Sequence, residues 1–185
     1  ITAITGTPNT AESVQNGETQ YYTAFTVMNE GVILVNSSGE IIACNPAAEK
    51  ILGVPLNDLI GVKSAGPIWK AIRPDGSDFP GEEHPTSLTL RTGEPVRNVE
   101  IGIYPPNGRL IWLNVNSEPI LNPGETLPGT VLASFSDITH RVQAETLLRQ
   151  EKENLATLLT LSQDLLIGNY QAIDFQKITD HLLLL

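Results

Sequence analysis

The sequence predicts an α+β fold in which a five-stranded antiparallel sheet carries short helices on one face. Short runs of apolar residues alternate with polar ones, which is typical of strands that bury a single face. Turns rich in glycine, asparagine and proline separate these runs from each other and from short helical segments. A long segment without glycine or proline follows the last strand and predicts a long C-terminal helix.

Residues 1–29 are expected to form a polar tail and then a helix that flanks the sheet domain. Thr10 suits the N-cap of this helix, since its hydroxyl can accept a hydrogen bond from a free backbone amide. Tyr21, Phe25 and Met28 follow at spacings of four and three residues, which places them on one apolar stripe.

The first two strands are predicted at Val32–Asn36 and Glu40–Cys44, about a turn that contains Gly39. Asn45 and Pro46 follow and predict the start of a short helix. An asparagine can cap the free amides of a helix, and a proline at the first helical position loses no hydrogen bond.

Two further short helices are predicted at Pro55–Ile60 and Pro85–Arg91, each followed by a glycine. The segment Val62–Glu83 lies between them. Its prolines and glycines interrupt every periodic pattern, so we expect it to be irregular.

The last three strands are predicted at residues 99–103, 111–115 and 131–135. Their alternation assigns one set of apolar side chains to the inner face of the sheet: Ile101, Ile103, Leu113, Val115, Val131, Ala133 and Phe135. Trp112 has the opposite register. We expect it on the outer face, covered by the N-terminal helix or by a partner chain, because an exposed indole there would leave a large apolar patch.

Residues 141–168 are predicted to form a linker helix that ends at Gly168. Leu148 and Leu155 occupy heptad position a, and Leu158 and Leu165 occupy position d. Polar residues at two other core positions make this seam imperfect. Such a helix needs a partner surface, so we expect a homodimer.

Residues 30–140 resemble a PAS sensor domain, the ligand- and signal-sensing module of bacterial signalling proteins. The resemblance rests on the order and spacing of several motifs: Gly31–Val35 with Gly39, Cys44–Glu49, Leu52-Gly53, Asn107-Gly108 with Trp112, and Asp137-Ile138-Thr139. The stretch from Glu82 to Pro85, with Thr92–Val96, is similar to one subgroup of these sensors.

This resemblance implies a pocket between the inner face of the sheet and the short helices. It also implies that Asp137 and Thr139 couple the last strand to an output helix; a plain helix cap without a switching role is the alternative. Residues 169–185 resemble the start of a GAF domain. The chain is therefore expected to be a segment of a longer sensor, whose effector would be, for example, a histidine kinase or a diguanylate cyclase.

The pocket candidates are Trp69, His84 and most of the inner-face set, namely Ile101, Ile103, Leu113, Val115, Ala133 and Phe135. Trp69 either walls a cavity or fills the core so that no cavity remains. His84 is expected to be a loop histidine that caps or hydrogen-bonds the Glu82-Glu83 turn, in preference to a haem ligand.

No cofactor is expected. Flavin-binding relatives present amide side chains to the flavin ring, whereas the corresponding positions here carry Ile103, Leu113 and Phe135. Each missing hydrogen bond to a buried flavin edge would cost about 1–3 kcal/mol. Ser64 occupies the position of their photoreactive cysteine.

The formal net charge is −10, from 11 Lys and Arg against 21 Asp and Glu. A field of this sign repels phosphate backbones, so no nucleic-acid partner is expected. No apolar run is long enough to span a membrane. The single cysteine, Cys44, rules out an internal disulfide and favours a reducing cytoplasm.

The sequence contains no phosphate-binding loop, hydrolase motif or zinc motif, so this segment is expected to be neither an enzyme nor a metal site. Two functions remain open. The preferred one is a sensory module that relays the binding of a small ligand or partner to a downstream effector. The alternative is a structural dimerisation module whose own side chains fill the pocket.

Overall fold

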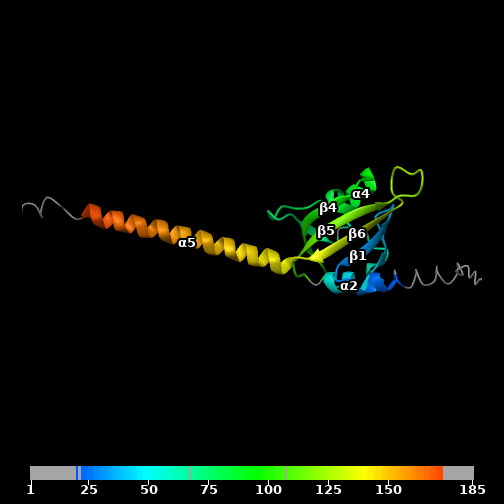
Figure 1. The fold of residues 1–185 in the computed structure, drawn as a ribbon, viewed down its shortest axis with the longest axis horizontal. Coiled ribbons are helices and arrows are strands. Elements are labelled where there is room, and N and C mark those ends of the chain that lie inside the picture. Colours follow the sequence, from blue (N-terminus) through cyan, green and yellow to red (C-terminus); the bar gives the residue numbers. More distant parts are fainter. Residues whose placement is uncertain (1–19, 21, 67, 107, 173–185) are drawn as a thin grey trace, which may run out of the picture. The chain divides into compact units, whose positions relative to one another are not determined.

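The structure is a computed structural model, and it describes residues 20, 22–66, 68–106 and 108–172 (Figure 1). The chain divides into two compact units, Ile1–Thr139 and His140–Leu185. The elements follow in this order: β1 Gly31–Asn36, β2 Ile41–Cys44, α2 Pro46–Leu52, α3 Leu56–Leu59, β3 Lys70–Ile72, the 3-10 turn η1 Gly81–Glu83, α4 Pro85–Thr92, β4 Val96–Tyr104, β5 Ile111–Ile120, β6 Thr130–Asp137 and α5 Thr139–Ala172.

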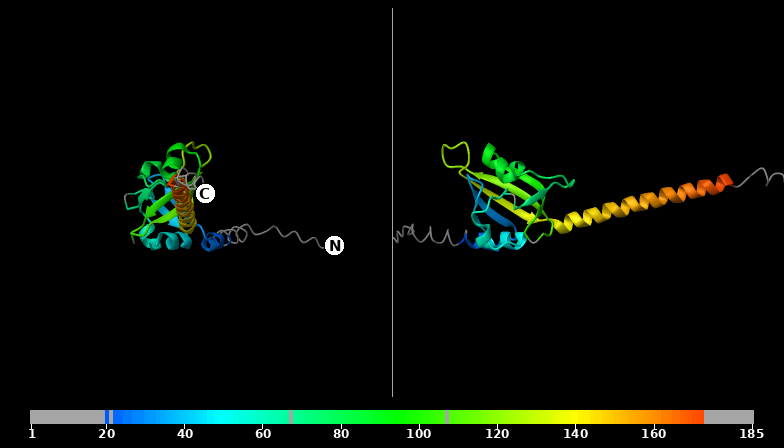
Figure 2. Two further views of the ribbon diagram at one scale, coloured as in Figure 1. Left: turned by 90° about the vertical axis from the view of Figure 1, so that its left-hand side faces the viewer. Right: turned by 180° about the vertical axis from the view of Figure 1, so that it is seen from behind.

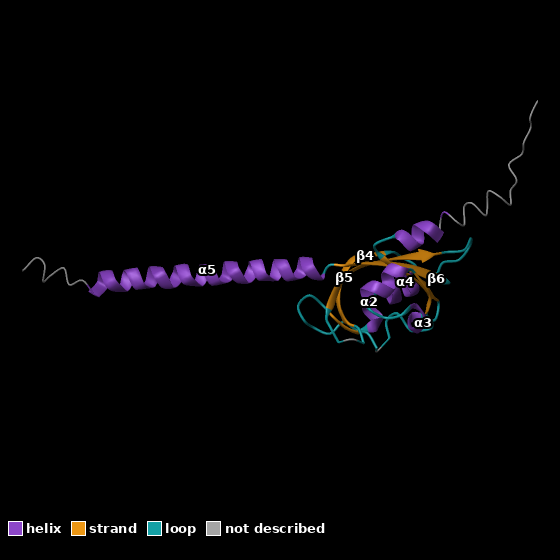
Figure 3. Cartoon of the chain, turned by 90° about the horizontal axis from the view of Figure 1, so that it is seen from below, coloured by secondary structure: helices purple, strands orange, loops and turns teal. Residues whose placement is uncertain are grey.

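The strands form one antiparallel sheet in the order β2-β1-β6-β5-β4-β3, which confirms the predicted fold class. Figure 2 shows this sheet from two further sides. Viewed from below, the sheet curves around α2, α3 and α4 (Figure 3). The sheet has six strands where the sequence predicted five. The additional strand, β3, lies in the segment expected to be irregular and pairs with β4 through Ala71 and Ile103. Three residues are too few to show an alternation, so tertiary pairing defines this strand.

The short helices begin and end at the residues that the sequence indicated. Asn45 caps α2, with its Oδ1 accepting a hydrogen bond from the Ala48 amide at 2.9 Å. Gly53 ends α2 with φ of 64°, and Gly93 ends α4 with φ of 72°. Both are left-handed conformations that favour glycine.

Asn45 also joins the N-terminal segment to the sheet. Its Oδ1 accepts a second hydrogen bond from the Val32 amide at 2.9 Å, and its Nδ2 donates to the carbonyls of Phe25 and Glu30 at 3.1 and 2.9 Å. Of the predicted flanking helix, residue 20 and residues 22–27 are helical. The rest, including Thr10 and Tyr21, lies outside the described residues.

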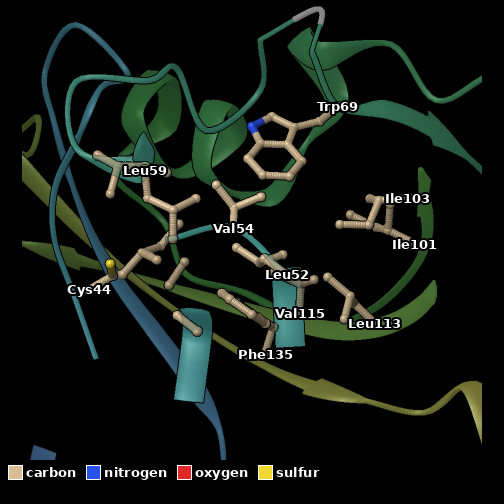
Figure 4. Close-up of a cluster of buried hydrophobic side chains, with 14 of the residues drawn as sticks. Cys44, Leu52, Val54, Leu59, Trp69, Ile101, Ile103, Leu113, Val115 and Phe135 are labelled. Atoms are coloured by element: carbon tan, nitrogen blue, oxygen red, sulfur yellow. The ribbon is translucent and has the colours of Figure 1, made fainter. Parts of the chain in front are cut away.

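The core lies between the concave face of the sheet and the short helices (Figure 4). All seven residues that alternation assigned to the inner face are buried. Trp112 is half-buried on the opposite face, where its indole packs over Gly102 beside Ile72 and Leu110. Whether a partner chain covers this face stays a prediction.

Helix α5 continues beyond the predicted end at Gly168, through Asn169 to Ala172. A glycine inside a helix costs only about 1 kcal/mol relative to alanine, so one glycine does not end a long helix. Of the segment 169–185 that resembles the start of a GAF domain, residues 173–185 lie outside the described residues.

Candidate ligand-binding site

A cavity of about 80 Å³ lies between the sheet and the short helices. Its walls come from β1, β2, α2, the start of α4, the three long strands and the segment that precedes β3. All eight predicted pocket residues line it: Trp69, His84, Ile101, Ile103, Leu113, Val115, Ala133 and Phe135. That they bind a ligand remains a prediction.

The structure adds six residues to the cavity wall: Ile33, Ile41, Leu52, Ser64, Pro85 and Thr86. The apolar members come from the first two strands and from α2 and α4, where no alternation separates an inner face. Ser64 and Thr86 are separated by 22 positions, and no periodic pattern links them. The signal for Ser64 is its place at the photoreactive cysteine of flavin-binding relatives, and Thr86 follows the proline that begins α4.

Four polar side chains interrupt the apolar lining. The Ser64 and Thr86 hydroxyls bond to each other at 3.0 Å. The Nε2 atom of His84 lies 3.2 Å from the carbonyl oxygen of Phe79. The fourth is Trp69, which is only 6% exposed, and its buried Nε1 has no hydrogen-bond partner among the described residues.

His84 is buried, and its surroundings favour a neutral imidazole. Burial lowers the pKa of His84 below its usual range, and the hydrogen bond to the Phe79 carbonyl opposes this shift in part. Because a carbonyl oxygen only accepts, Nε2 carries the proton of the neutral ring. His84 is thus hydrogen-bonded as expected, although its partner is Phe79 and not the Glu82-Glu83 turn.

A surface arginine supports the loop that leads to His84. Arg73 bonds to Glu83 at 2.6 Å and to the Asp78 carbonyl, and its guanidinium lies 4.9 Å from the centre of the Phe79 ring. The Phe79 ring in turn lies 5.2 Å from the His84 ring, centre to centre. These contacts connect a charged surface loop to one wall of the cavity.

A second pair of hydroxyls joins α4 to the sheet. Thr89 on α4 and Ser117 on β5 bond at 2.6 Å, and both residues are fully buried. A buried polar pair of this kind fixes relative position, because breaking it leaves a hydroxyl without a partner. No sequence pattern predicts this pair, because its two members lie 28 positions apart.

The predicted relay residues meet at the start of α5. Asp137 Oδ1 accepts a hydrogen bond from the Thr139 amide at 2.8 Å, and Thr139 Oγ1 accepts one from the Trp112 amide at 2.9 Å. The Ile138 amide donates to the Trp112 carbonyl at 2.8 Å. Trp112 on β5 therefore holds the start of the helix through both of its backbone groups.

The predicted helix-interface leucines lie along α5, in the second unit. Leu148, Leu155 and Leu158 are 53%, 59% and 62% exposed. Leu165 is within the helix, but its side chain is outside the described part. Pairing of this stripe with a second copy remains a prediction.

Within the described ranges, no group of three or more His, Cys, Asp or Glu side chains is placed to hold a metal ion. None of the described helices is both long and apolar enough to cross a membrane.

Comparison with known proteins identifies the fold and the family. A family model described as "PAS domain" matches residues 29–140. The crystal structure of a PAS domain from Colwellia psychrerythraea has a TM-score of 0.53 and 20% identity, covering 66% of this chain and 98% of that one. At this identity the structural match supports the fold alone.

Two curated relatives are sensor kinases. The signal transduction histidine-protein kinase AtoS of Escherichia coli (strain K12) is 32% identical over 130 residues, which cover 70% of this chain and 19% of that protein. The sensor histidine kinase TmoS of Ectopseudomonas mendocina is 25% identical over 142 residues, covering 77% of this chain and 14% of that protein. The chain thus spans less than a fifth of the length of either relative.

The matched residues contain the whole curved sheet, the cavity and the Asp137–Thr139 junction. They make up more than half of the chain. The chain belongs to the PAS domain family, and its PAS sensor domain is homologous to those of histidine kinases.

Proposed function

We propose that this chain is a non-catalytic sensory module that takes a small ligand into the cavity and relays its presence to a downstream effector. The observation that carries this proposal is the cavity itself: about 80 Å³ of apolar space inside the domain, beside a buried donor for which the described part of the chain supplies no partner. Binding sites are typically apolar, with a few placed polar groups. The small volume favours a ligand much smaller than haem or flavin.

The relay would run through β5. Leu113 lines the cavity, and its neighbour Trp112 points to the other face while its backbone holds Ile138 and Thr139. A ligand that displaces Leu113 would therefore act on the start of α5 through a single peptide unit. Such a ligand shifts an equilibrium between two packings only by its difference in affinity for them.

The effector is proposed to be a histidine kinase, with a diguanylate cyclase as the other candidate. The similarity to two sensor histidine kinases supports the first. We also propose that α5 pairs with α5 of a second copy, since several leucines on it are more than half exposed. The single cysteine favours a cytoplasmic setting for the whole module.

Native mass spectrometry tests the ligand directly. The protein is incubated with a mixture of small metabolites, and an added mass is expected on the unmodified chain. The control variant is Ala133→Leu, because Ala133 is 1% exposed and lines the cavity, so a larger side chain fills it. The added mass should disappear in this variant.

The rival function is a structural dimerisation module with a pocket filled by its own side chains. It predicts no added mass with either protein, together with unchanged self-association in the Ala133→Leu variant. Absence of bound mass across repeated metabolite mixtures would contradict the sensory proposal and favour this alternative.

A further inference from the structure

The indole N–H of Trp69 is a buried hydrogen-bond donor that has no partner among the described residues. Only two buried side-chain atoms of the described residues are in this position, Trp69 Nε1 and Asn114 Oδ1, and Trp69 lines the cavity. Buried tryptophans usually find an acceptor for this group, because a donor removed from water and left unpaired costs free energy. The cavity therefore offers a ligand one strong, directional contact that the protein itself does not use. Figure 4 shows the indole across the apolar cluster from Val115 and Phe135.

The other polar groups of the wall are already engaged. The Ser64 and Thr86 hydroxyls bond to each other, so one O–H of that pair is left to donate. The Nε2 of His84 faces the carbonyl oxygen of Phe79. These groups keep capacity both to donate and to accept, whereas Trp69 Nε1 can only donate and has no partner among the described residues, so an acceptor oxygen on a ligand would satisfy it.

The wall also restricts the charge of a ligand. Within the described ranges no Asp, Glu, Lys or Arg lines the cavity, and burial lowers the pKa of His84, which favours its neutral ring. A charged ligand would be removed from water with no opposite charge to compensate it. The ligand is therefore uncharged.

The volume restricts its size. An apolar cavity of about 150 Å³ is known to accept benzene, whereas one water molecule takes about 30 Å³ of the liquid. A cavity of about 80 Å³ holds fewer heavy atoms than benzene and more than a single water. A molecule of about four or five heavy atoms fits these limits.

We infer that Trp69 Nε1 donates a hydrogen bond to the acceptor oxygen of a small uncharged ligand, of the class of short-chain carbonyl compounds. This inference rests on the proposed sensory function, since it names the chemistry of the ligand that the same cavity takes. A carbonyl oxygen accepts and never donates, which matches an indole N–H that can only donate. The short hydrocarbon part of such a ligand contacts Ile101, Leu113 and Phe135.

The full chain labelled with ¹⁵N reports on this contact directly, because it contains two tryptophans and hence two indole N–H signals. A Trp112→Phe variant assigns them. Titration with 2-butanone is expected to shift the Trp69 indole proton downfield in a saturable manner, while the Trp112 signal stays in place. The Ala133→Leu variant, with its filled cavity, should lose the shift.

The matched control ligand is 2-methyl-1-butene, which replaces the carbonyl oxygen of 2-butanone by a CH₂ group of similar shape. One net hydrogen bond corresponds to about two- to tenfold tighter binding, so the ketone should bind tighter by this factor. Equal affinity, or an equal shift of the indole proton by both ligands, would overturn the inference. So would a water molecule that still shows a nuclear Overhauser effect to the Trp69 indole proton at saturating ketone.

Xenon separates this inference from the proposed function, because it enters apolar cavities without any hydrogen bond. If xenon shifts the Ala133 methyl signal while 2-butanone leaves the Trp69 indole signal unchanged, the hydrogen bond from Trp69 is refuted, although the cavity still binds small molecules. If neither probe shifts a signal from the cavity, both the sensory function and the hydrogen bond from Trp69 are refuted.

Discussion

Replacing Gly31 by alanine should push a core aromatic ring into the cavity. Gly31 on β1 pairs with Phe135 on β6, and the Phe135 ring lies over the glycine. A Cβ at position 31 would lie 2.6 Å from Phe135 Cζ and closer still to Cε2. Carbon atoms pack at about 3.5–4.0 Å, so the ring must move by about 1 Å or more. Phe135 is 4% exposed and lines the cavity, so the free space available to it is the cavity itself.

The expected cost is set by two opposing effects. Adding a methyl group to a packed core typically costs about 1–3 kcal/mol. Replacing a strand glycine by alanine contributes about 0.5–1 kcal/mol in the stabilising direction, through the entropy of the unfolded chain. We therefore expect Gly31→Ala to lower the free energy of unfolding by about 1–2 kcal/mol. It should also reduce occupancy of the cavity by any ligand.

A double-mutant cycle with Phe135→Leu measures the ring contact separately. Leucine lacks the ring atoms that the new Cβ would meet, so in this background the cost of Gly31→Ala disappears. The substitution should then stabilise the domain by about 0.5–1 kcal/mol. Urea unfolding followed by tryptophan fluorescence gives all four free energies. If Gly31→Ala destabilises the protein equally in both backgrounds, the ring contact is not the cause and the reasoning is wrong.

Four further predictions follow from particular side chains. Asn45→Ala removes a helix cap and three other hydrogen bonds, so urea unfolding should show a loss of about 2–4 kcal/mol; a loss below about 1 kcal/mol would contradict this. Because burial lowers the pKa of His84, the unfolded chain takes up a proton first, and stability should fall as the pH drops below about 6.5. His84→Gln should flatten that dependence between pH 7 and pH 5, and an unchanged slope would count against it. Leu155→Asp combined with Leu158→Asp should weaken self-association in analytical ultracentrifugation, and an unchanged dimer mass would argue against helix pairing. Burial, with a smaller effect of Glu49, raises the pKa of the Cys44 thiol, so a thiol reagent at pH 8 should react far more slowly with the folded protein than with protein in urea.

The sequence was most informative where a pattern repeats. Three of the five predicted strands show clear alternation, and alternation also fixes which face each side chain takes. This is why residues as distant as Ile101 and Phe135 could be assigned to one pocket wall, where the structure places both. The Asn45 cap of α2, the prolines that begin α2 and α4 and the glycines that end both helices are local signals of equal quality.

The features that escaped prediction depend on contacts between distant segments. Strand β3 exists through its pairing with β4, and its three residues carry no pattern of their own. The Ser64–Thr86 bond joins an irregular segment to a helix start, and the Thr89–Ser117 bond joins a helix to a strand. For Trp69, the sequence left a cavity wall and a filled core as alternatives. The structure shows a tryptophan that is buried in the core and also borders a remaining space.

An exposed ion pair on the loop between Arg73 and His84 supports one wall of a cavity that is itself uncharged. Arg73 and Glu83 are 33% and 53% exposed in their side chains, so dissolved ions screen their attraction. The same arginine stacks on Phe79, whose carbonyl holds His84 at the cavity wall. Raising the ionic strength should therefore loosen this wall and accelerate the escape of an uncharged guest, although the guest itself feels no Coulomb force.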